Sequence, residues 1–175
     1  MFNLFQKSLN INKHWGKCCI SLDELDHKNS FYWLDKRNYN ILGNYHCLTD
    51  KQKSEIDNDN VNNFIVLPQY LTDSRYKELV RELNNPTVTQ FFNEAKNEEE
   101  AHFRYRCFID WNALELSEWY KDYLIVSNML IDWCIKNNIK YKHKLENPPK
   151  NYIYDGRDLS KEKWVFHYDE LKYFS

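Results

Sequence analysis

The longest helical pattern of apolar residues in the chain runs from Ser117 to Asn138, and it constrains the fold more than any other stretch. Its members recur at alternating steps of four and three residues: Trp119, Tyr123, Val126, Leu130 and Trp133. That spacing places them on one face of an α-helix that packs against a core. The sequence therefore predicts a central helix over 117–138, with the Ser117 hydroxyl at its N-cap.

Composition indicates one folded domain of regular structure. A chain of 175 residues fits a single domain, and a 17% share of aromatic residues excludes a disordered chain. Only three Gly and four Pro are present, which favours long regular elements over a turn-rich β-sandwich. We expect one domain over 1–175, with an N-terminal arm at 1–17 and a C-terminal extension at 143–175.

Charge and cysteine content indicate where such a chain resides. A net charge of −2 gives no global field that favours nucleic acid, a membrane or acidic partners. The chain lacks the run of about 18 apolar residues that a membrane span needs, and its start, MFNLFQKSLNINKHW, lacks the apolar run of a signal peptide. Five Cys is an odd number, and a domain of this size needs no disulfide. We expect a cytoplasmic protein with reduced cysteines and no membrane partner.

Three short runs of aromatic and β-branched residues predict a small sheet. Runs at 31–34 and 39–42 flank a polar turn at 35–38, a pattern typical of a β-hairpin. A third run at 63–67 predicts a strand that ends at Pro68, because proline cannot donate to a sheet ladder. The polar residues 49–63 between them predict an exposed, mobile loop.

Cap signals predict further helices before the central one. Ser21 and Glu24 have the spacing of a capping box, which predicts a brief helix over 22–27. Thr72 or Asp73 would cap the helix that follows. The expected buried face of this helix consists of Tyr76, Leu79, Val80 and Leu83.

Two more helices and a tail complete the predicted fold. Asn85 and Pro86 suit the cap and first position of a helix, and Glu98 to Glu100 suit the N-terminus of another. KWVFHY at 163–168 alternates, which predicts a late strand or an extended arm. The fold class is therefore α+β: a small antiparallel β-sheet, formed by a hairpin plus one strand, packed against three to four α-helices, with a C-terminal extended or strand tail.

The order of motifs resembles that of a known family. ISLDELDHK, FYWLDKRNYNIL and FIVLP precede helices that carry FRYR, EWY and DWCIKNNI. In this order, over about residues 18–142, the chain resembles the bacterial uncharacterised protein family UPF 0158. FRYR departs from the family pattern, which tends toward a second Arg and a Phe at Tyr105 and Arg106. The resemblance implies an α+β fold with a small antiparallel sheet and a helical half, and it implies no activity.

The first candidate site is an aromatic surface with two arginines, which would bind a protein partner or an anion. Arg104 and Arg106 lie two residues apart on a helix, so they point in different directions and cannot form one fork. One of them beside an aromatic ring would make a cation–π or anion-binding corner. The alternative is that the Arg stems cover the aromatic core while their charged ends reach water or a Glu. The candidate residues are Phe103, Arg104, Arg106, Trp119 and Tyr120.

The second candidate site is the basic end of the central helix. Lysines with Tyr141 among them suit contacts to phosphate groups, and the alternative is a solvated charged face. The candidate phosphate contacts are Lys136, Lys140, Lys142 and Lys144.

Metal and catalytic chemistry find little support in the sequence. Cys18 and Cys19 are adjacent, as are His46 and Cys47, whereas structural zinc prefers ligand pairs spaced by two to four residues. No GxSxG, HExxH, P-loop or GxGxxG motif occurs. Glu118 lies near a helix start, where a carboxylate suits the helix dipole. We expect no catalytic residues, no metal and no cofactor.

By elimination, the sequence predicts a non-catalytic cytoplasmic protein that binds a protein partner, as an immunity-like, inhibitory or regulatory module. The main alternative is a nucleic-acid-associated protein that uses a basic and aromatic surface. A third alternative is an enzyme with an unrecognised site.

Overall fold

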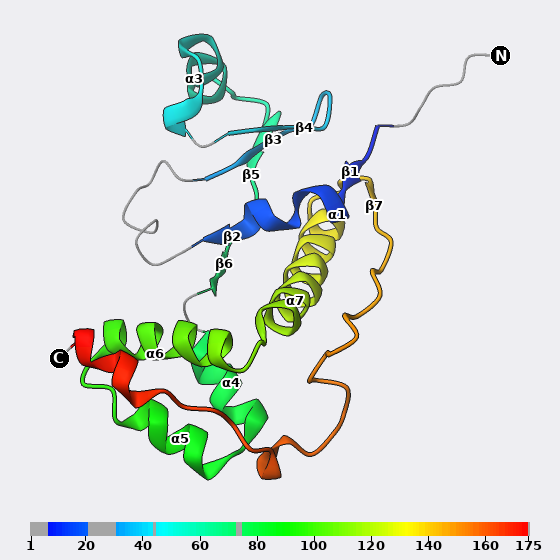
Figure 1. Cartoon of the computed structure of the whole chain (residues 1–175). Coiled ribbons are helices and arrows are strands. Elements are labelled where there is room, and N and C mark those ends of the chain that lie inside the picture. The colour runs from blue at the N-terminus through cyan, green and yellow to red at the C-terminus, as the bar shows by residue number, and fades with distance from the viewer. Residues whose placement is uncertain (1–6, 21–30, 44, 73–74, 175) are drawn as a thin grey trace. The chain divides into compact units, whose positions relative to one another are not determined.

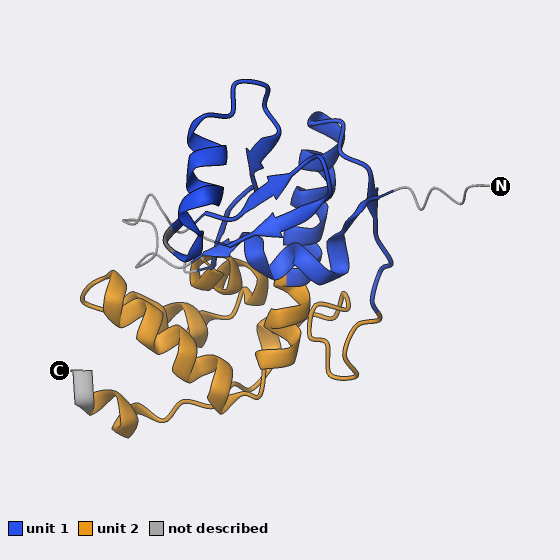
Figure 2. Ribbon diagram, turned by 90° about the horizontal axis from the view of Figure 1, so that it is seen from above, with its two compact units in different colours: residues 1–72, 123–146 blue, residues 73–122, 147–175 orange. Residues whose placement is uncertain are grey.

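The computed structural model describes residues 7–20, 31–43, 45–72 and 75–174 (Figure 1). The chain divides into two compact units, one of Met1–Thr72 with Tyr123–Glu146 and the other of Asp73–Asp122 with Asn147–Ser175 (Figure 2). They are called unit 1 and unit 2 below. The single domain expected over 1–175 stays a prediction, as do the arm at 1–17 and the extension at 143–175.

Unit 1 contains the predicted antiparallel sheet. Strands β3 (Trp33–Asp35), β4 (Asn40–Leu42) and β5 (Phe64–Val66) pair in the order β4-β3-β5. Leu34 lies opposite Ile41 on one side and Ile65 on the other, and both pairings are antiparallel. The hairpin turn places Tyr39 at φ 63°, in the left-handed region. The hairpin and its third strand are thus confirmed.

Unit 1 also holds two short parallel ladders that the sequence did not predict. Strand β1 (Leu9–Asn10) pairs with β7 (Tyr141–Lys142), and β2 (Cys19–Ile20) pairs with β6 (Tyr70–Leu71). Helix α1 (Ile11–His14) and the 3-10 turn η1 (Trp15–Cys18) connect β1 to β2. Strands of two residues are too short to show an alternating pattern, and their partners lie far away in sequence.

The loop predicted at 49–63 is wrong over its first half, which forms helix α3 (Asp50–Asp57) after the 3-10 turn η2 (Tyr45–Cys47). A capping box opens α3: Gln52 N donates to Thr49 Oγ1, and Thr49 N donates to Gln52 Oε1. The signal was therefore present as T-x-x-Q. No residue of α3 is buried, so the helix has no apolar period to reveal it.

The core of unit 1 gathers residues from all of these segments around helix α7 (Glu115–Lys136), whose part from Tyr123 onward belongs to this unit. Its buried members are apolar side chains and two cysteines: Leu9, Ile11, Cys18, Leu34, Leu67, Val126, Leu130, Cys134 and Ile139. Helix α7 contributes three of them and every other contributing segment only one, so the unit depends on contacts between residues distant in sequence.

Unit 2 is helical and confirms the predicted starts of two helices, at Asn85 and at Glu98. It contains α4 (Arg75–Leu83), α5 (Pro86–Asn93), α6 (Glu98–Trp111) and the first residues of α7. Asn85 Oδ1 accepts hydrogen bonds from Thr87 N and Val88 N, with Pro86 at the first helical position. Glu98, Glu99 and Glu100 occupy the first turn of α6, as expected.

The C-terminal tail of unit 2 lies along these helices. The 3-10 turns η4 (Leu159–Lys161) and η5 (Tyr168–Phe174) flank an extended segment, drawn red and orange in Figure 1 along α5 and α6. Trp164 and Phe166 pack on the core, while Val165 is exposed. The alternation of 163–168 therefore describes an extended arm and not a strand. The buried core of the unit consists of Leu79, Leu83, Val88, Phe91, Phe92, Phe108, Ile109, Leu114, Ile153 and Leu159.

The α+β class is confirmed at this level, and two finer predictions are corrected. The described residues form six α-helices, α1 and α3 to α7, where three to four were expected. The strands form three small sheets where one was expected. The short helix predicted over 22–27, and Asp73 as a cap, lie outside the described residues. None of the described helices has the length and apolar content needed to cross a membrane.

Candidate functional site

A buried arginine organises the polar interior of unit 2. Arg75 is only 1% exposed, and its Nη2 lies 2.9 Å from Glu118 Oε2. Its Nε lies 3.3 Å from Asp122 Oδ1, its Nη1 donates to Glu78 Oε2, and its Nη2 lies 3.6 Å from Glu82 Oε2. Four carboxylates therefore surround one guanidinium, which links α4 to the first two turns of α7.

Two tyrosines complete the shell of Glu118. Tyr105 Oη donates to Glu118 Oε2 at 2.8 Å, and Tyr154 Oη donates to Glu118 Oε1. Burial, followed by the negative charge of Glu118, raises the pKa of both phenols far above the ordinary range. Both tyrosines therefore stay protonated and act as hydrogen-bond donors.

Charge pairing also decides the pKa of the arginine. Burial by itself would lower the pKa of Arg75, but the negative charges of Glu118 and its neighbours outweigh burial and raise it. A charge this deeply buried requires such partners, because removing an ion from water costs several kcal/mol. Glu118 thus accepts three side-chain hydrogen bonds that join α4, α6 and the C-terminal tail to α7.

The network fixes how α7 begins. Glu118 points inward, and so do its neighbours Ser117 and Tyr120, which are 3% and 4% exposed. Ser117 Oγ donates to Asn151 O and accepts from Ile153 N, while the Tyr120 ring meets Tyr152 edge-on. The predicted N-cap role of Ser117 is wrong, because α7 begins at Glu115 and the Ser117 hydroxyl instead binds the C-terminal tail.

The opposite face of this first turn carries two exposed apolar side chains. Leu116 is 67% exposed and Trp119 is 47% exposed. At about 100° per residue, both lie on the same side of α7 as Tyr123, Val126 and Leu130, which are buried in unit 1. The apolar stripe predicted for this helix thus continues into its first turn, where Leu116 and Trp119 are exposed. Leu116 and Trp119 are called the exposed α7 face below.

Arg104 adopts the structural role that the sequence left as the alternative. It is 7% exposed, and its Nη2 donates to Glu100 Oε1 at 2.8 Å. Its Nη1 donates to Phe91 O at 2.6 Å, and its guanidinium lies 5.1 Å from the centre of the Phe91 ring. This arginine holds α5 against α6 and offers no surface to a ligand.

The other members of the first candidate site do not form one surface with Arg104. Arg106 is exposed and Phe103 is half-buried. Tyr120 is buried against the C-terminal tail, and Trp119 is exposed. A helical spacing cannot reveal this separation, because the inward direction of α7 at this end is set by Glu118 and not by its aromatic residues. The inward position of Arg75 did have a signal, since Arg75, Leu79 and Leu83 share one helical stripe.

The second candidate site lies in unit 1, where Lys136, Lys140, Lys142 and Lys144 are all exposed. Lys136 ends α7, and Lys142 belongs to β7. Backbone bonds hold this segment in place: Leu9 N donates to Lys140 O at 2.8 Å, and Lys144 N donates to Asn12 Oδ1 at 2.9 Å. The four lysines are therefore carried by one ordered segment.

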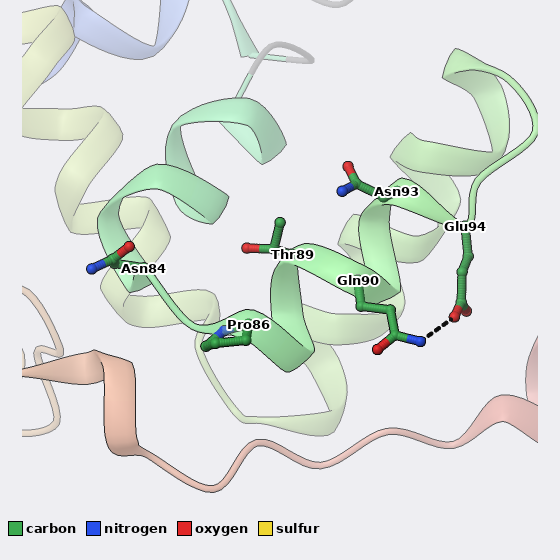
Figure 3. Close-up of a pocket in the computed structure, with 6 residues that line it drawn as sticks. All are labelled: Asn84, Pro86, Thr89, Gln90, Asn93 and Glu94. Atoms are coloured by element: carbon green, nitrogen blue, oxygen red, sulfur yellow. Dashed lines mark hydrogen bonds between the residues drawn. The ribbon is translucent and has the colours of Figure 1, made fainter.

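Two open surface depressions lie on the helices of unit 2. The depression in Figure 3 has a volume of about 540 Å³ and lies along α5; its lining consists of Asn84, Pro86, Thr89, Gln90, Asn93 and Glu94. Figure 3 shows these side chains spread along the helix, with Gln90 bonded to Glu94, and they do not converge on one point. A second depression of about 460 Å³ is floored by Tyr76 and Phe92 and bordered by the ion pair of Lys77 with Glu98.

The two buried cysteines of unit 1 lie in apolar surroundings. Burial raises the pKa of Cys18 to about 12 and that of Cys134 to about 11. Both thiols therefore favour the protonated form, which is a weak nucleophile. Within the described ranges, no three His, Cys, Asp or Glu side chains gather as a metal site.

Comparison with known proteins adds no family. The chain matches no protein-family model, and it has no significant match among curated proteins or solved structures. The resemblance to UPF 0158 stays a prediction, based on the motifs alone.

Proposed function

We propose that the chain is a non-catalytic binding protein that docks a protein partner on the exposed α7 face. One observation carries the proposal. Leu116 and Trp119 continue a buried apolar stripe, yet they are 67% and 47% exposed. Covering a leucine and a tryptophan stabilises a complex, because burial of one large apolar side chain contributes about 1.5–3 kcal/mol.

The geometry of the face suits recognition. Tryptophan is among the residues most enriched at the energetic centres of interfaces. The turn that carries Trp119 is held by the Arg75–Glu118 ion pair and by the Ser117 hydrogen bonds to the tail. Docking on a fixed helical turn loses little conformational entropy, which favours affinity.

Charge suggests the kind of partner. Over Asp73–Asp122 and Asn147–Ser175, unit 2 contains 12 Lys and Arg against 16 Asp and Glu, a net charge of −4. Glu115 is exposed in the same first turn. A net negative unit with an exposed carboxylate beside the apolar face favours the encounter with a basic partner. We therefore propose an inhibitory, immunity-like or regulatory role in the cytoplasm, with a basic protein as the target.

The test compares the exposed α7 face with an equally exposed residue elsewhere. Val61 in unit 1 is 67% exposed, the same fraction as Leu116, so Val61→Asp is a matched control for Leu116→Asp. Tagged chains are expressed in the native cells, and stoichiometric co-purifying protein is quantified, followed by calorimetric titration with that protein. We expect Leu116→Asp and Trp119→Ala each to weaken binding about 30-fold, corresponding to about 2 kcal/mol, and Val61→Asp to leave it unchanged.

Two results would contradict this proposal. If all three variants bind the recovered protein as tightly as the wild type, the partner does not dock on the exposed α7 face. If the wild-type chain recovers no protein in stoichiometric amount, the binding function itself is wrong. Thermal melting serves as the folding control, since exposed substitutions change stability by about 0.5 kcal/mol or less.

A further inference from the structure

A second surface, in unit 1, combines lysines from two distant parts of the chain. The parallel pairing of β1 with β7 places Leu9 beside Tyr141 and Asn10 beside Lys142. Asn12 Nδ2 donates to Lys144 O at 2.7 Å, which extends the contact beyond the ladder. The pairing thus adds two N-terminal lysines to the four near the end of α7. The resulting lysine surface consists of Lys7, Lys13, Lys136, Lys140, Lys142 and Lys144.

These lysines are exposed and not neutralised. All six are exposed, and none forms an ion pair with a carboxylate among the described residues. The segments 7–14 and 136–146 contain these six lysines and a single acidic residue, Glu146. The Glu146 carboxylate accepts a hydrogen bond from Asn12 Nδ2 at 3.3 Å.

Some exposed lysines of unit 2 lie next to carboxylates and pair with them. Lys77 pairs with Glu98, Lys161 with Asp158 and Lys172 with Asp169. What distinguishes the lysine surface is its number of lysines against one acidic residue in the same two segments. Six like charges held together repel one another, and an anionic ligand relieves that repulsion.

An aromatic residue lies between two of these lysines in the sequence. Tyr141 is 38% exposed and stands between Lys140 and Lys142 in the extended backbone of β7. Alternate residues of a strand face the same side, so Lys140 and Lys142 share a side and Tyr141 faces the other. Basic residues that follow a phosphate backbone, combined with an aromatic ring on which a base stacks, are the elements of single-strand recognition.

We propose that the β1–β7 ladder binds single-stranded nucleic acid, with lysines of the lysine surface contacting phosphates on one side of the extended segment and Tyr141 stacking on a base at the other. The site is separate from the exposed α7 face and does not depend on the proposed protein partner. A duplex fits less well, because its bases are already stacked and not available to Tyr141.

The test measures fluorescence anisotropy of a labelled oligo(dT) of about 20 nucleotides, with a duplex of the same length for comparison. Three lysine–phosphate contacts predict that affinity falls about 20-fold between about 50 mM and about 200 mM salt. Lys140→Glu, Lys142→Glu and Lys144→Glu together should weaken binding more than tenfold. Tyr141→Ala should weaken it about tenfold, while Tyr141→Phe keeps the stacking ring and stays near the wild type.

A matched control separates this surface from net charge alone. Lys96, Lys150 and Lys163 are exposed in unit 2, and changing all three to Glu alters the net charge by the same amount. This control variant should bind like the wild type. If the ladder variant has lost its fold by circular dichroism, the single change Lys142→Glu takes its place.

Several outcomes would overturn the proposal. These are no binding at the lower salt, equal loss in the control variant, tighter binding of the duplex, and unchanged binding by Tyr141→Ala. A membrane surface would appear instead if vesicles with about 30% phosphatidylserine retain the protein at a salt concentration where oligo(dT) does not.

Discussion

The two units pair their buried charged side chains in different ways. In unit 1 the buried Asp35 binds Arg37, whose side chain is 48% exposed, so the pair reaches water. In unit 2 both partners are buried, with the side chains of Arg75 and Glu118 exposed by 1% and 6%. A pair at the surface contributes little to stability, whereas a fully buried pair makes each partner depend on the other.

This difference has a consequence for the surfaces of the molecule. The buried network in unit 2 dictates which side of α7 faces inward, and so exposes Leu116 and Trp119. In unit 1 the charged groups at the β1–β7 ladder have no such inward partners, and its lysines remain at the surface. One unit therefore presents an apolar face and the other presents a basic one.

The largest expected effect comes from removing the buried charge. Arg75→Met leaves the buried carboxylate of Glu118 without the guanidinium that pairs with it, and should destabilise the protein by about 3–5 kcal/mol. Urea unfolding followed by circular dichroism measures this change. Arg157→Met is the matched control, because Arg157 pairs with Asp155 at 2.7 Å but both side chains are 47% exposed; its cost should stay below about 1 kcal/mol. Equal midpoints for the two variants would remove the distinction between the units.

An intermediate effect is expected at the helix caps. Asn85 is buried, caps α5 and also donates from Nδ2 to Ser160 O at 2.8 Å and Glu162 O at 3.2 Å. Asn85→Ala should therefore cost about 2 kcal/mol, combining a lost cap with unpaired buried carbonyls. The exposed cap of unit 1, Thr49, serves no second segment, and Thr49→Ala should cost about 0.5 kcal/mol. Chemical unfolding of both variants decides the order, and a larger loss for Thr49→Ala would reverse the comparison.

The smallest effect is a pH dependence in unit 1. Burial, followed by the charges of Lys13 and Lys17, lowers the pKa of His14 below its ordinary value. The unfolded chain therefore binds a proton more readily than the folded one, and stability falls as the pH drops from about 7.5 to about 5.5. Melting temperatures at the two pH values should differ less for His14→Gln than for the wild type. An equal difference in both would show that His14 does not contribute.

Local sequence signals predicted those elements that are stabilised locally. The caps at Asn85 and at the start of α6 were found because a cap depends on residues within one turn. The hairpin was found because its two strands are adjacent in sequence. Helix α3 was missed for the opposite reason: its capping box was present, but an exposed polar helix lacks the apolar period used to find it. The two parallel ladders were missed because residues such as Leu9 and Tyr141 meet only in the folded chain.

For the candidate site residues too, the sequence predicted some properties and only the fold decided others. The aromatic and basic residues were identifiable by type, but Arg104 and Trp119 have opposite exposure although both lie in the same helical half. Helical periodicity gives the relative angles of side chains and not the direction of the core. Glu118 was interpreted as a residue that suits the helix dipole, whereas the structure places it at the centre of a buried network with Arg75, Tyr105 and Tyr154.

The sequence by itself determined the α+β fold class, the positions of most helices in unit 2 and the antiparallel sheet in unit 1. These features follow from hydrogen bonds and apolar contacts between neighbouring residues, which leave a readable pattern. Only the tertiary structure decided which face of α7 is covered and which lysines lie together. The covered face of α7 depends on the pairing of Arg75 with Glu118, which are more than 40 residues apart. The grouping of the lysines depends on the contact between Asn12 and Lys144, which are more than 100 residues apart. No local pattern encodes such pairings.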